Sequence, residues 1–282
     1  NLAAVGLCDA FGDGKPNAEA TGCSGSGRGK ADCTILTDGA HTVFIDCAEA
    51  DDSETILSAL RENRISQIDL LIVTHFDKDH IGGVPEVLES VSVLRVIEPD
   101  YEPENPETEA YIAYRAALDR VGLTPEAISD SLDVTLGDMQ LSILGAGGAA
   151  YEKNTDNNNS LVVTVTHCEN RFFFAGDIEK QRIADLLETG VASCDVLKVP
   201  HHGGYNKQLP ALFAVLGMKE AVITCSEKNP ADKETVDHLD ALGCRVWRTV
   251  NGTVRVISDQ NGIAISVSRR AITPAIRSME RS

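Results

Sequence analysis

The chain has 282 residues, 43% of them apolar, so it can bury a core of the size of a full α/β domain, and disorder of the whole chain is excluded. Its formal net charge of −18 repels polyanions at long range, so no stable binding of duplex nucleic acid is expected. Bound divalent cations can reverse the potential locally, and a small phosphate ester therefore stays open as a substrate. No stretch approaches about 18 consecutive apolar residues, and the sequence predicts no membrane span.

The beginning of the chain predicts a short strand followed by a long loop. Residues 1–7 are mostly apolar but have no basic region and no clear cleavage site, which favours a strand over a signal peptide. Residues 12–31 are rich in Gly and Ser and are typical of a mobile loop. A cytoplasmic location and export with a signal trimmed earlier both stay open.

The eight cysteines are scattered along the chain and form no Cys-x-x-Cys pair. This spacing disfavours a structural zinc site and a thioredoxin-like motif. Several cysteines lie in apolar runs, where a small buried thiol is the simplest interpretation. Because their number is even, disulfides stay open if the protein is exported.

From residue 33 onward, alternating and apolar runs predict strands and helices in regular succession. Two β-rich runs at 33–37 and 42–46 flank an Asp-Gly pair that is typical of a hairpin turn. The apolar run at 68–74 is typical of a strand covered on both faces. Further strands are predicted at 93–97, 139–144, 161–166, 171–175, 195–199, 221–225, 244–248, 253–257 and 263–268, and helices at 54–63, 84–90, 107–121, 208–216 and 232–242.

Strands in hairpins occur in both halves of the chain, with helices between them. This order predicts an α/β fold of four layers, an αββα sandwich in which two mixed sheets pack face to face and helices cover the outer faces. No internal repeat and no linker divides the chain, so a single domain over residues 1–282 is expected.

The most informative segment is Thr-His-Phe-Asp-Lys-Asp-His-Ile-Gly-Gly at 74–83, which follows a predicted buried strand and precedes a predicted helix. It places four potential ligands, His75, Asp77, Asp79 and His80, within six residues. Imidazole and carboxylate groups are ligands of zinc, manganese and iron at catalytic sites. A polar loop that only caps a helix is the alternative, but such a loop does not need two histidines.

Two later segments place similar groups at strand ends. The apolar run 172–175 leads through Gly176 to Asp177, a position suited to a carboxylate that bridges two cations, although an acid that caps the following helix explains it equally well. The run 196–200 ends in His201 and His202. Four of the seven histidines therefore lie at strand ends in two short motifs, which indicates a shared site.

These motifs resemble those of the metallo-β-lactamase superfamily, and more narrowly those of the hydrolase domain of ComEC-type DNA-internalisation proteins. The resemblance extends from about residue 29 to 258. The matching segments are Gly-Lys-Ala-Asp-Cys at 29–33, Val-Phe-Ile-Asp at 43–46, the motif at 75–83, Asn-Asn-Asn-Ser-Leu-Val at 157–162, Gly-Asp-Ile-Glu at 176–179 and Leu-Lys-Val-Pro-His-His-Gly at 197–203.

The resemblance implies a centre of two divalent metal ions. The implied ligands are His75 and Asp77 on one ion, Asp79, His80 and one later histidine on the other, and Asp177 as the bridge between them. His201 is favoured as the later histidine, which leaves His202 beside the ligand set or facing the substrate. Asp46 would order the loop near the site without binding metal.

Three departures from the family pattern concern the metal and the substrate. Asp77 stands where the superfamily usually has histidine, and the Asn-rich run 157–159 stands where another histidine is usual. Oxygen-bearing groups in these places move the preference from Zn²⁺ toward Mn²⁺ or iron. In addition, residues 228–232 lack a Gly-His-Pro sequence that is common in the ComEC-type domain, which argues against nuclease activity more than against metal binding.

The resulting hypothesis is a hydrolase in which two metal ions activate a water molecule. Asp79 would bind metal and would also orient this water molecule. Asn158, Asn159 and Ser160 would donate hydrogen bonds to a developing oxyanion, unless this run is an ordinary loop before a strand. The favoured substrate is a phosphodiester in a small nucleotide or an oligonucleotide. The alternatives are hydrolysis of a thioester, lactone or amide at the same centre, and a metal-binding sensing or interaction module without turnover.

Overall fold

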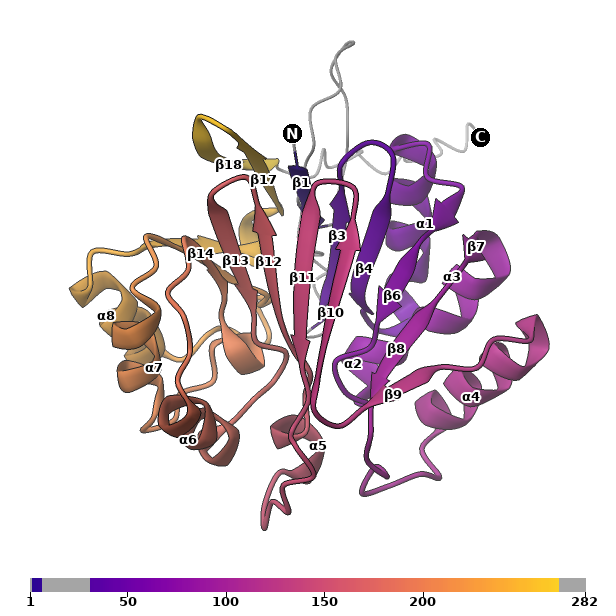
Figure 1. Ribbon diagram of the computed structural model, residues 1–282, viewed down its shortest axis with the longest axis horizontal. Coiled ribbons are helices and arrows are strands. Elements are labelled where there is room, and N and C mark those ends of the chain that lie inside the picture. The colour runs from indigo at the N-terminus through magenta and orange to yellow at the C-terminus, as the bar shows by residue number, and fades with distance from the viewer. Residues whose placement is uncertain (1, 7–30, 269–282) are drawn as a thin grey trace, which may run out of the picture.

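Two mixed β-sheets face each other through the middle of the protein (Figure 1). The structure is a computed structural model, and it describes residues 2–6 and 31–268. The first sheet consists, in spatial order, of β18 (Gly262–Ser268), β17 (Thr253–Asp259), β1 (Leu2–Gly6), β3 (Cys33–Thr37), β4 (Thr42–Cys47), β6 (Leu70–Ile72), β8 (Val96–Pro99) and β9 (Glu126–Ile128). The second consists of β10 (Ser131–Leu136), β11 (Met139–Leu144), β12 (Val162–His167), β13 (Asn170–Phe174), β14 (Val196–Lys198), β15 (Glu220–Ile223) and β16 (Arg245–Arg248).

Each sheet joins an antiparallel half to a parallel half. In the first sheet, β4, β6, β8 and β9 run parallel, while β1, β3, β17 and β18 pair antiparallel. In the second sheet, β10 to β13 pair antiparallel, and β13 to β16 run parallel. The parallel halves are connected through helices, because a parallel pair needs a crossover. A short parallel pair of β5 (Gln67–Ile68) and β7 (Ser92–Val93) forms a small sheet of its own, directly before β6 and β8 in the chain.

Helices cover the outer face of each sheet (Figure 1). The apolar sides of α1 (Ser53–Glu62), α3 (Val84–Ser90) and α4 (Glu109–Val121) join the core cluster of the first sheet. Those of α6 (Lys180–Thr189), α7 (Leu209–Leu216) and α8 (Lys233–Ala241) form a second cluster on the other sheet. The expected αββα sandwich is therefore confirmed.

Strand β13 shows how one strand contributes to both layers of the core. Phe172 and Phe174 belong to the cluster between the sheets, whereas Phe173 belongs to the cluster under the helices. Successive side chains of a strand point to opposite faces, so an apolar run without alternation is what a strand buried on both sides requires. Each such side chain stabilises the fold by roughly 1.5–3 kcal/mol relative to an exposed one.

The short elements that the site uses lie at one edge of the sandwich, where α2 (Lys78–Ile81), α5 (Thr155–Asn158) and the 3₁₀ segment η2 (Pro200–Gly203) follow strands. The remaining short 3₁₀ segments are η1 (Ala50–Asp52) and η3 (Thr249–Asn251). Backbone hydrogen bonds join these loops: Leu161 donates to the carbonyl of Thr74 between the two sheets, and His201 donates to the carbonyl of Gly176 within the second sheet. The ends of strands from both sheets therefore meet at this edge.

Most predicted elements occur close to their predicted bounds, but some were divided or missed. The strands predicted at 68–74 and 93–97 are each split into two, and the sequence analysis did not identify β9, β10, α2 or α5. Helix α6 was considered only as the helix that Asp177 would cap. The strand expected at the beginning of the chain is present as β1, while the predicted mobile loop lies outside the described residues except for residue 31. Within the described part of the chain, no helix is both long and apolar enough to cross a membrane.

The cysteines offer a test of the core. Burial raises the pKa of the Cys194 thiol to about 12 and that of Cys244 to about 11, whereas Cys168 is exposed. Because the thiolate is the reactive form, we expect iodoacetamide at pH near 8 to label Cys168 within minutes and the two buried thiols only after unfolding. Mass spectrometry of the digested protein measures the labelling. Equal labelling rates for Cys168 and Cys194 in the folded protein would contradict this packing.

Candidate metal centre

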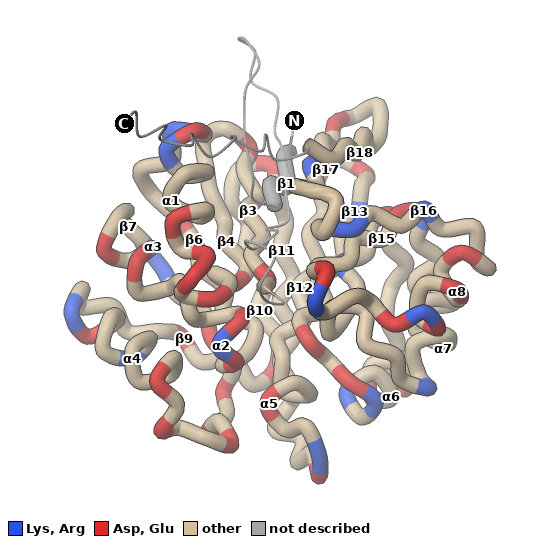
Figure 2. The backbone as a smooth tube through the Cα atoms, turned by 180° about the vertical axis from the view of Figure 1, so that it is seen from behind, with Lys and Arg blue, Asp and Glu red and all other residues tan. Residues whose placement is uncertain are grey.

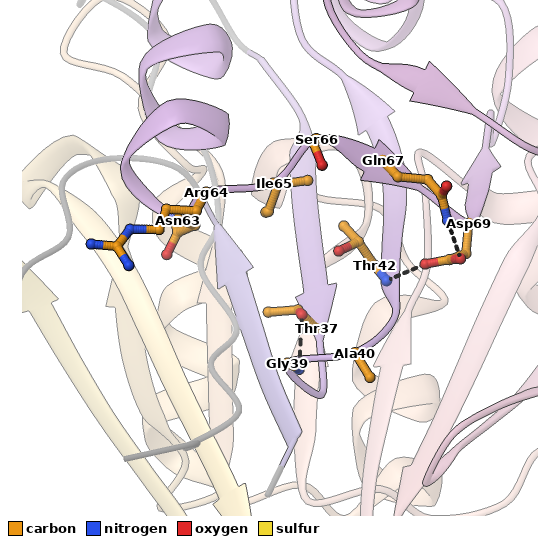
Figure 3. A pocket seen from close by; sticks show the side chains of 10 residues that line it. All are labelled: Thr37, Gly39, Ala40, Thr42, Asn63, Arg64, Ile65, Ser66, Gln67 and Asp69. Atoms are coloured by element: carbon orange, nitrogen blue, oxygen red, sulfur yellow. Dashed lines mark hydrogen bonds between the residues drawn. The ribbon is translucent and has the colours of Figure 1, made fainter. Parts of the chain in front are cut away.

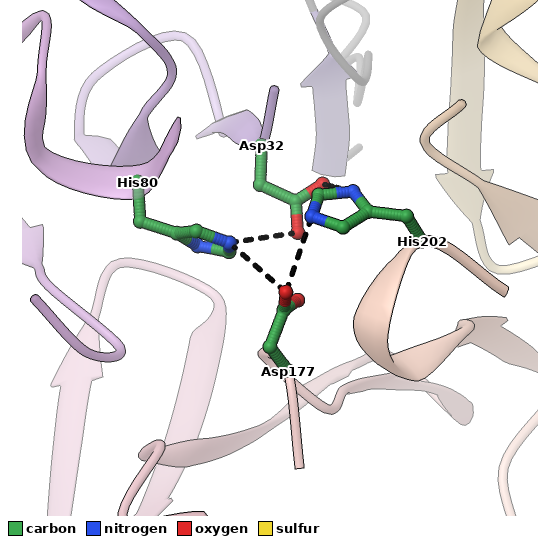
Figure 4. A group of neighbouring side chains, drawn as sticks. All are labelled: Asp32, His80, Asp177 and His202. Carbon is green, nitrogen blue, oxygen red and sulfur yellow. Dashed lines mark ion pairs between the residues drawn. The ribbon is translucent and has the colours of Figure 1, made fainter. Parts of the chain in front are cut away.

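Four buried side chains from separate parts of the chain converge where the two sheets meet (Figure 4). They are Asp32, which precedes β3, His80 of α2, Asp177, which follows β13, and His202 of η2. Each offers one ligand atom, and the four atoms lie within 4.8 Å of one another. Imidazole nitrogen and carboxylate oxygen at such spacing form a donor set for a divalent cation.

The distances between the ligand atoms fit the surroundings of one ion. The Nε2 atom of His202 lies 3.1 Å from Asp177 Oδ2 and 3.3 Å from Asp79 Oδ2. The Nε2 atom of His80 lies 3.5 Å from the same oxygen of Asp177. Ligands held about 2.1 Å from one ion are separated from each other by about 3.0 to 3.4 Å. Asp79 therefore joins the group from the side of His202.

Hydrogen bonds at the opposite ring nitrogens fix both imidazoles. The Nδ1 atom of His80 lies 2.7 Å from Asp46 Oδ2, and that of His202 lies 3.1 Å from the carbonyl oxygen of Thr224. Each Nδ1 is the natural donor, since both partners are acceptors. In the neutral ring, Nε2 then presents its lone pair to the carboxylates, and a backing acceptor of this kind is typical of metal-binding histidines.

Several of these atoms have no hydrogen-bond partner among the described residues. They are Nε2 of His75, Nε2 of His80, Nε2 of His202 and both carboxylate oxygens of Asp32, of which Oδ2 contacts the Lys198 ammonium without a hydrogen bond of ordinary geometry. Buried polar atoms are normally satisfied, so a group of unsatisfied acceptors that face each other calls for a shared positive charge. A divalent cation fits this requirement, and the residues present are chemically suited to it.

The pKa values show the same demand for positive charge. Burial lowers the pKa of His202, but the carboxylates of Asp177 and Asp32 outweigh burial and raise it to about 9. Burial also opposes charge on His80, yet Asp177 and Asp46 hold the pKa of that imidazole well above its usual range. Conversely, burial favours protonation of Asp177, but the two imidazoles and Lys198 hold the pKa of its carboxyl well below the ordinary value.

Asp46 organises the loop that carries the first motif. Its carboxylate accepts hydrogen bonds from the backbone nitrogen and the hydroxyl of Thr74, both at 2.7 Å, in addition to its contact with His80. The residue adopts a φ of 61°, a left-handed conformation that is unusual for aspartate. The carboxylate is thus occupied by the loop, as expected from the sequence.

His75 and Asp77 form a second pair of donors next to the four converging residues. The Nε2 atom of His75 lies 3.6 Å from Asp77 Oδ2, and its ring packs at a tilt of 54° against that of His80 with centroids 4.0 Å apart. The side chain of Asp77 is 46% exposed, so it faces the opening of the site, whereas His75 is fully buried. The first motif therefore reaches from the interior of the site to its rim.

The structure brings His202 into the cluster and leaves His201 outside it, which reverses the order favoured from the sequence. His201 is 33% exposed, and its Nδ1 atom lies 3.3 Å from a carboxylate oxygen of Glu179. The cause is the backbone: φ is 48° at His201, 54° at His202 and 82° at Gly203, so three successive residues turn in the left-handed sense. Strained backbone of this kind is frequent at functional sites.

The asparagine run holds the surrounding loops together through hydrogen bonds. The geometry of Asn158 gives no support to its expected role as a donor to an oxyanion. The Oδ1 atom of Asn158 accepts from the backbone nitrogens of Glu179 and Arg182, and its Nδ2 donates to the carbonyls of Lys153 and Asn154. An amide that makes four such bonds has no donor left for a substrate.

The two neighbours of Asn158 are also tied to the loops. Asn159 donates to the carbonyl of Thr155, and the hydroxyl of Ser160 accepts from the backbone nitrogen of Asp177 at 3.3 Å. Ser160 is completely buried. The run therefore positions Asp177 and the start of α6, which a sequence interpretation based on donor chemistry alone did not anticipate.

Sequence reasoning missed two charged residues of the site, Asp32 and Lys198. Asp32 lay inside a segment that matched the family, but no role was assigned to it. Lys198 interrupts the apolar run Val-Leu-Lys-Val at 196–199, and a lysine in such a run was a signal available in the sequence, because buried lysines are rare unless they are paired. Its ammonium contacts Asp32 Oδ2 and lies 3.4 Å from Asp177 Oδ1.

A hollow of about 300 Å³ lies at the start of β4, at the opposite end of this strand from Asp46 (Figure 3). Its lining is polar, but several of its groups satisfy one another: Asp69 accepts from the backbone nitrogen of Thr42 and from the side chain of Gln67. It has no histidine or cysteine in its lining. The groups suited to metal binding therefore lie at the other end of the sheet, and not in this hollow.

Residues 26–226 match the model of the metallo-beta-lactamase superfamily, and the chain therefore belongs to that superfamily. It is similar to ComE operon protein 3 of Bacillus subtilis (strain 168), with 28% identity over 207 residues that cover 72% of this chain and 26% of that protein. It is also similar to Recombination protein 2 of Haemophilus influenzae, with 24% identity over 211 residues that cover 73% of this chain and 24% of that protein. The chain thus spans about a quarter of the length of these relatives.

A solved structure supports the same fold. The metallo-beta-lactamase fold protein YhfI from Bacillus subtilis superposes with a TM-score of 0.51 at 11% identity, covering 88% of this chain and 94% of that chain. The superfamily and the αββα fold that the sequence suggested are confirmed by these similarities.

The glycine before Asp177 provides a test of this packing. Gly176 has a φ of 54°, and a Cβ atom there would lie 2.9 Å from the Cβ of Ser160. Gly122 has a similar φ of 72° but open space around it, so Gly122→Ala is a matched control. We expect the control to lower the free energy of unfolding by about 1–2 kcal/mol, and Gly176→Ala by roughly a further 1–3 kcal/mol because it also overpacks the core. Urea denaturation measures both values, and equal costs would refute the described contact.

Proposed function

We propose that this chain is a metal-dependent hydrolase that cleaves a phosphodiester in a small nucleotide or a short oligonucleotide. The observation that carries the proposal is the convergence of His80, His202, Asp79 and Asp177, whose ligand atoms approach one another to between 3.1 and 3.5 Å. No hydrogen-bond network among the described residues satisfies these imidazole atoms. A site for divalent cations accounts for both facts.

In this proposal the centre has two positions for metal ions, either zinc or manganese. Asp79, His80, Asp177 and His202 would hold one ion, and His75 with Asp77 would hold the other with Asp177 between them. The second position has fewer protein ligands, and one of these is an exposed carboxylate, so its affinity is expected to be lower. When bound at such a centre, divalent ions lower the pKa of water toward neutrality and neutralise charge on a phosphoryl oxygen.

The protein's own groups prepare the site for this chemistry. Asp46 and the carbonyl of Thr224 orient the imidazoles, so neither ring has to reorganise during the reaction. Burial favours protonation of Asp79, but its hydrogen bond and charge interactions with His202 and His80 keep its pKa well below the usual value. Asp79 therefore stays ionised, and it can accept a hydrogen bond from a water molecule and orient that molecule toward the substrate.

The charge of the protein favours a small substrate. Asp and Glu number 43 against 25 Lys and Arg, and acidic segments lie around α2 and α5 near the centre (Figure 2). Such a surface repels an extended polyanion but leaves a small phosphodiester accessible once cations are bound.

Activity on a generic substrate tests the reaction class. We expect the chain loaded with Mn²⁺ or Zn²⁺ to hydrolyse bis-p-nitrophenyl phosphate, and Asp177→Ala to lose at least roughly a hundredfold of this rate together with its metal, because the shared ligand is gone. Asp138→Ala changes an exposed turn aspartate and serves as the control. Turnover of a thioester in place of the phosphodiester would reassign the substrate, and bound metal without any turnover would favour a sensing or interaction module.

The histidine pair tests the ligand assignment. We expect His202→Ala to weaken Mn²⁺ binding by at least about a hundredfold, since it removes a buried ligand and its backing hydrogen bond. His201→Ala should retain an affinity within about threefold of the native protein, because His201 contacts Glu179 outside the cluster. Competition against a fluorescent chelator measures both affinities. The reverse pattern would restore His201 as the ligand.

A further inference from the structure

A charged lysine lies beneath the proposed metal centre, inside the second sheet. Lys198 is the last residue of β14, and its side chain is only 8% exposed. Its ammonium donates to the carbonyl oxygen of Gly176 at 3.0 Å and lies 3.4 Å from Asp177 Oδ1. A buried ammonium is costly unless it is paired, so its partners determine what it does in the site.

The main partner of Lys198 is Asp32. The ammonium contacts Asp32 Oδ2, while neither oxygen of Asp32 accepts a hydrogen bond of ordinary geometry from the described residues. The carboxylate is 3.7 Å from Nε2 of His80, farther than Asp177 is from the same atom. Asp32 is thus a buried acid within reach of the centre that is already engaged by a protein cation.

Asp32 lies among the converging side chains, but it contacts a different atom of the His202 ring from the other two carboxylates. Its Oδ1 atom lies 3.8 Å from Nδ1 of His202, the ring nitrogen that also faces the carbonyl of Thr224. Asp79 and Asp177 approach the other ring nitrogen, Nε2, at 3.3 and 3.1 Å. Asp32 is therefore nearest to Nδ1 of this ring, the nitrogen already occupied by Thr224, and not to the nitrogen that faces the other two carboxylates.

Lysine and a divalent ion compete for the same carboxylates. One oxygen of Asp177 faces the ammonium, and the other faces the two imidazoles. A unit positive charge a few ångströms from a bound dication is repulsive, and in a buried site this repulsion is weakly screened. Asp32 offsets the charge of Lys198 and so keeps the centre attractive to metal.

We propose that Lys198 is a fixed internal cation of the metal centre, which engages Asp32 and keeps this acid out of the ligand set, and which limits how tightly the centre holds its metal ions. This inference rests on the proposed function, because it assumes that the centre takes up divalent ions. Lys198 acts through Asp32 and Asp177 and is a positioning residue.

The proposal predicts changes of opposite sign for the two partners. Lys198→Met removes the charge and frees Asp32, so Mn²⁺ should bind at least about tenfold more tightly. Asp32→Asn leaves the ammonium without its main counter-ion, so Mn²⁺ should bind at least about tenfold more weakly. The double variant removes both charges and should return to within about threefold of the native affinity, a coupling that a double-mutant cycle measures.

The measurements are chelator competition with Mn²⁺ and the d–d absorption spectrum of the Co²⁺-loaded protein, neither of which depends on turnover. The spectrum should change in Lys198→Met as Asp32 becomes available, and stay native-like in the double variant. Asp69→Asn is the control, since Asp69 holds a backbone nitrogen in the remote hollow and should not affect either measurement.

The possible outcomes separate this proposal from the proposed function. A native protein that binds neither Mn²⁺ nor Zn²⁺ would overturn both. If the native protein binds metal, equal or weaker Mn²⁺ affinity in Lys198→Met overturns only the role of Lys198. Should Lys198→Met fail to fold, Asp32→Asn decides: a loss of about tenfold or more with an unchanged Co²⁺ spectrum supports the proposal. An unchanged or increased affinity, or a spectrum altered by the loss of a ligand, refutes it.

Discussion

The hydrogen bond between Asp46 and His80 is the constraint on which the rest of the centre depends. It connects the end of β4 to α2, and the same carboxylate also holds Thr74 after β6. Three segments of the first sheet are thereby fixed relative to each other without any group of the second sheet. The ring of His80 then has one orientation, in which Nε2 faces Asp177 across the junction of the sheets.

The long, periodic elements of the fold were predictable, because their apolar patterns are determined locally. The helix Val84–Ser90 and the strand Met139–Leu144 have the predicted bounds, and the arrangement of hairpins and helices indicated the sandwich. The four-residue helices α2 and α5 are too short to show a period. Strand β10 alternates between exposed and half-buried residues and so has no strongly apolar face to reveal it.

The site was predictable where its groups are close together in sequence and not where contacts between distant segments decide. His75, Asp77, Asp79 and His80 come from one loop, and the structure gathers them at one edge. The choice between His201 and His202 depends on a left-handed backbone turn that residue types do not encode. The pair of Asp32 and Lys198 spans most of the chain, and only the folded arrangement of both sheets brings its members together.

The hydrogen bonds between the asparagine run and the Asp177 loop limit how the length of this region can vary among homologous proteins. Ser160 holds the backbone nitrogen of Asp177, and Asn158 holds those of Glu179 and Arg182. Two connections on either side of a hairpin are therefore locked together as one body. Insertions or deletions between residues 154 and 160 would break these hydrogen bonds and shift Asp177. Homologous proteins should therefore conserve the length of this loop even where they exchange side chains elsewhere.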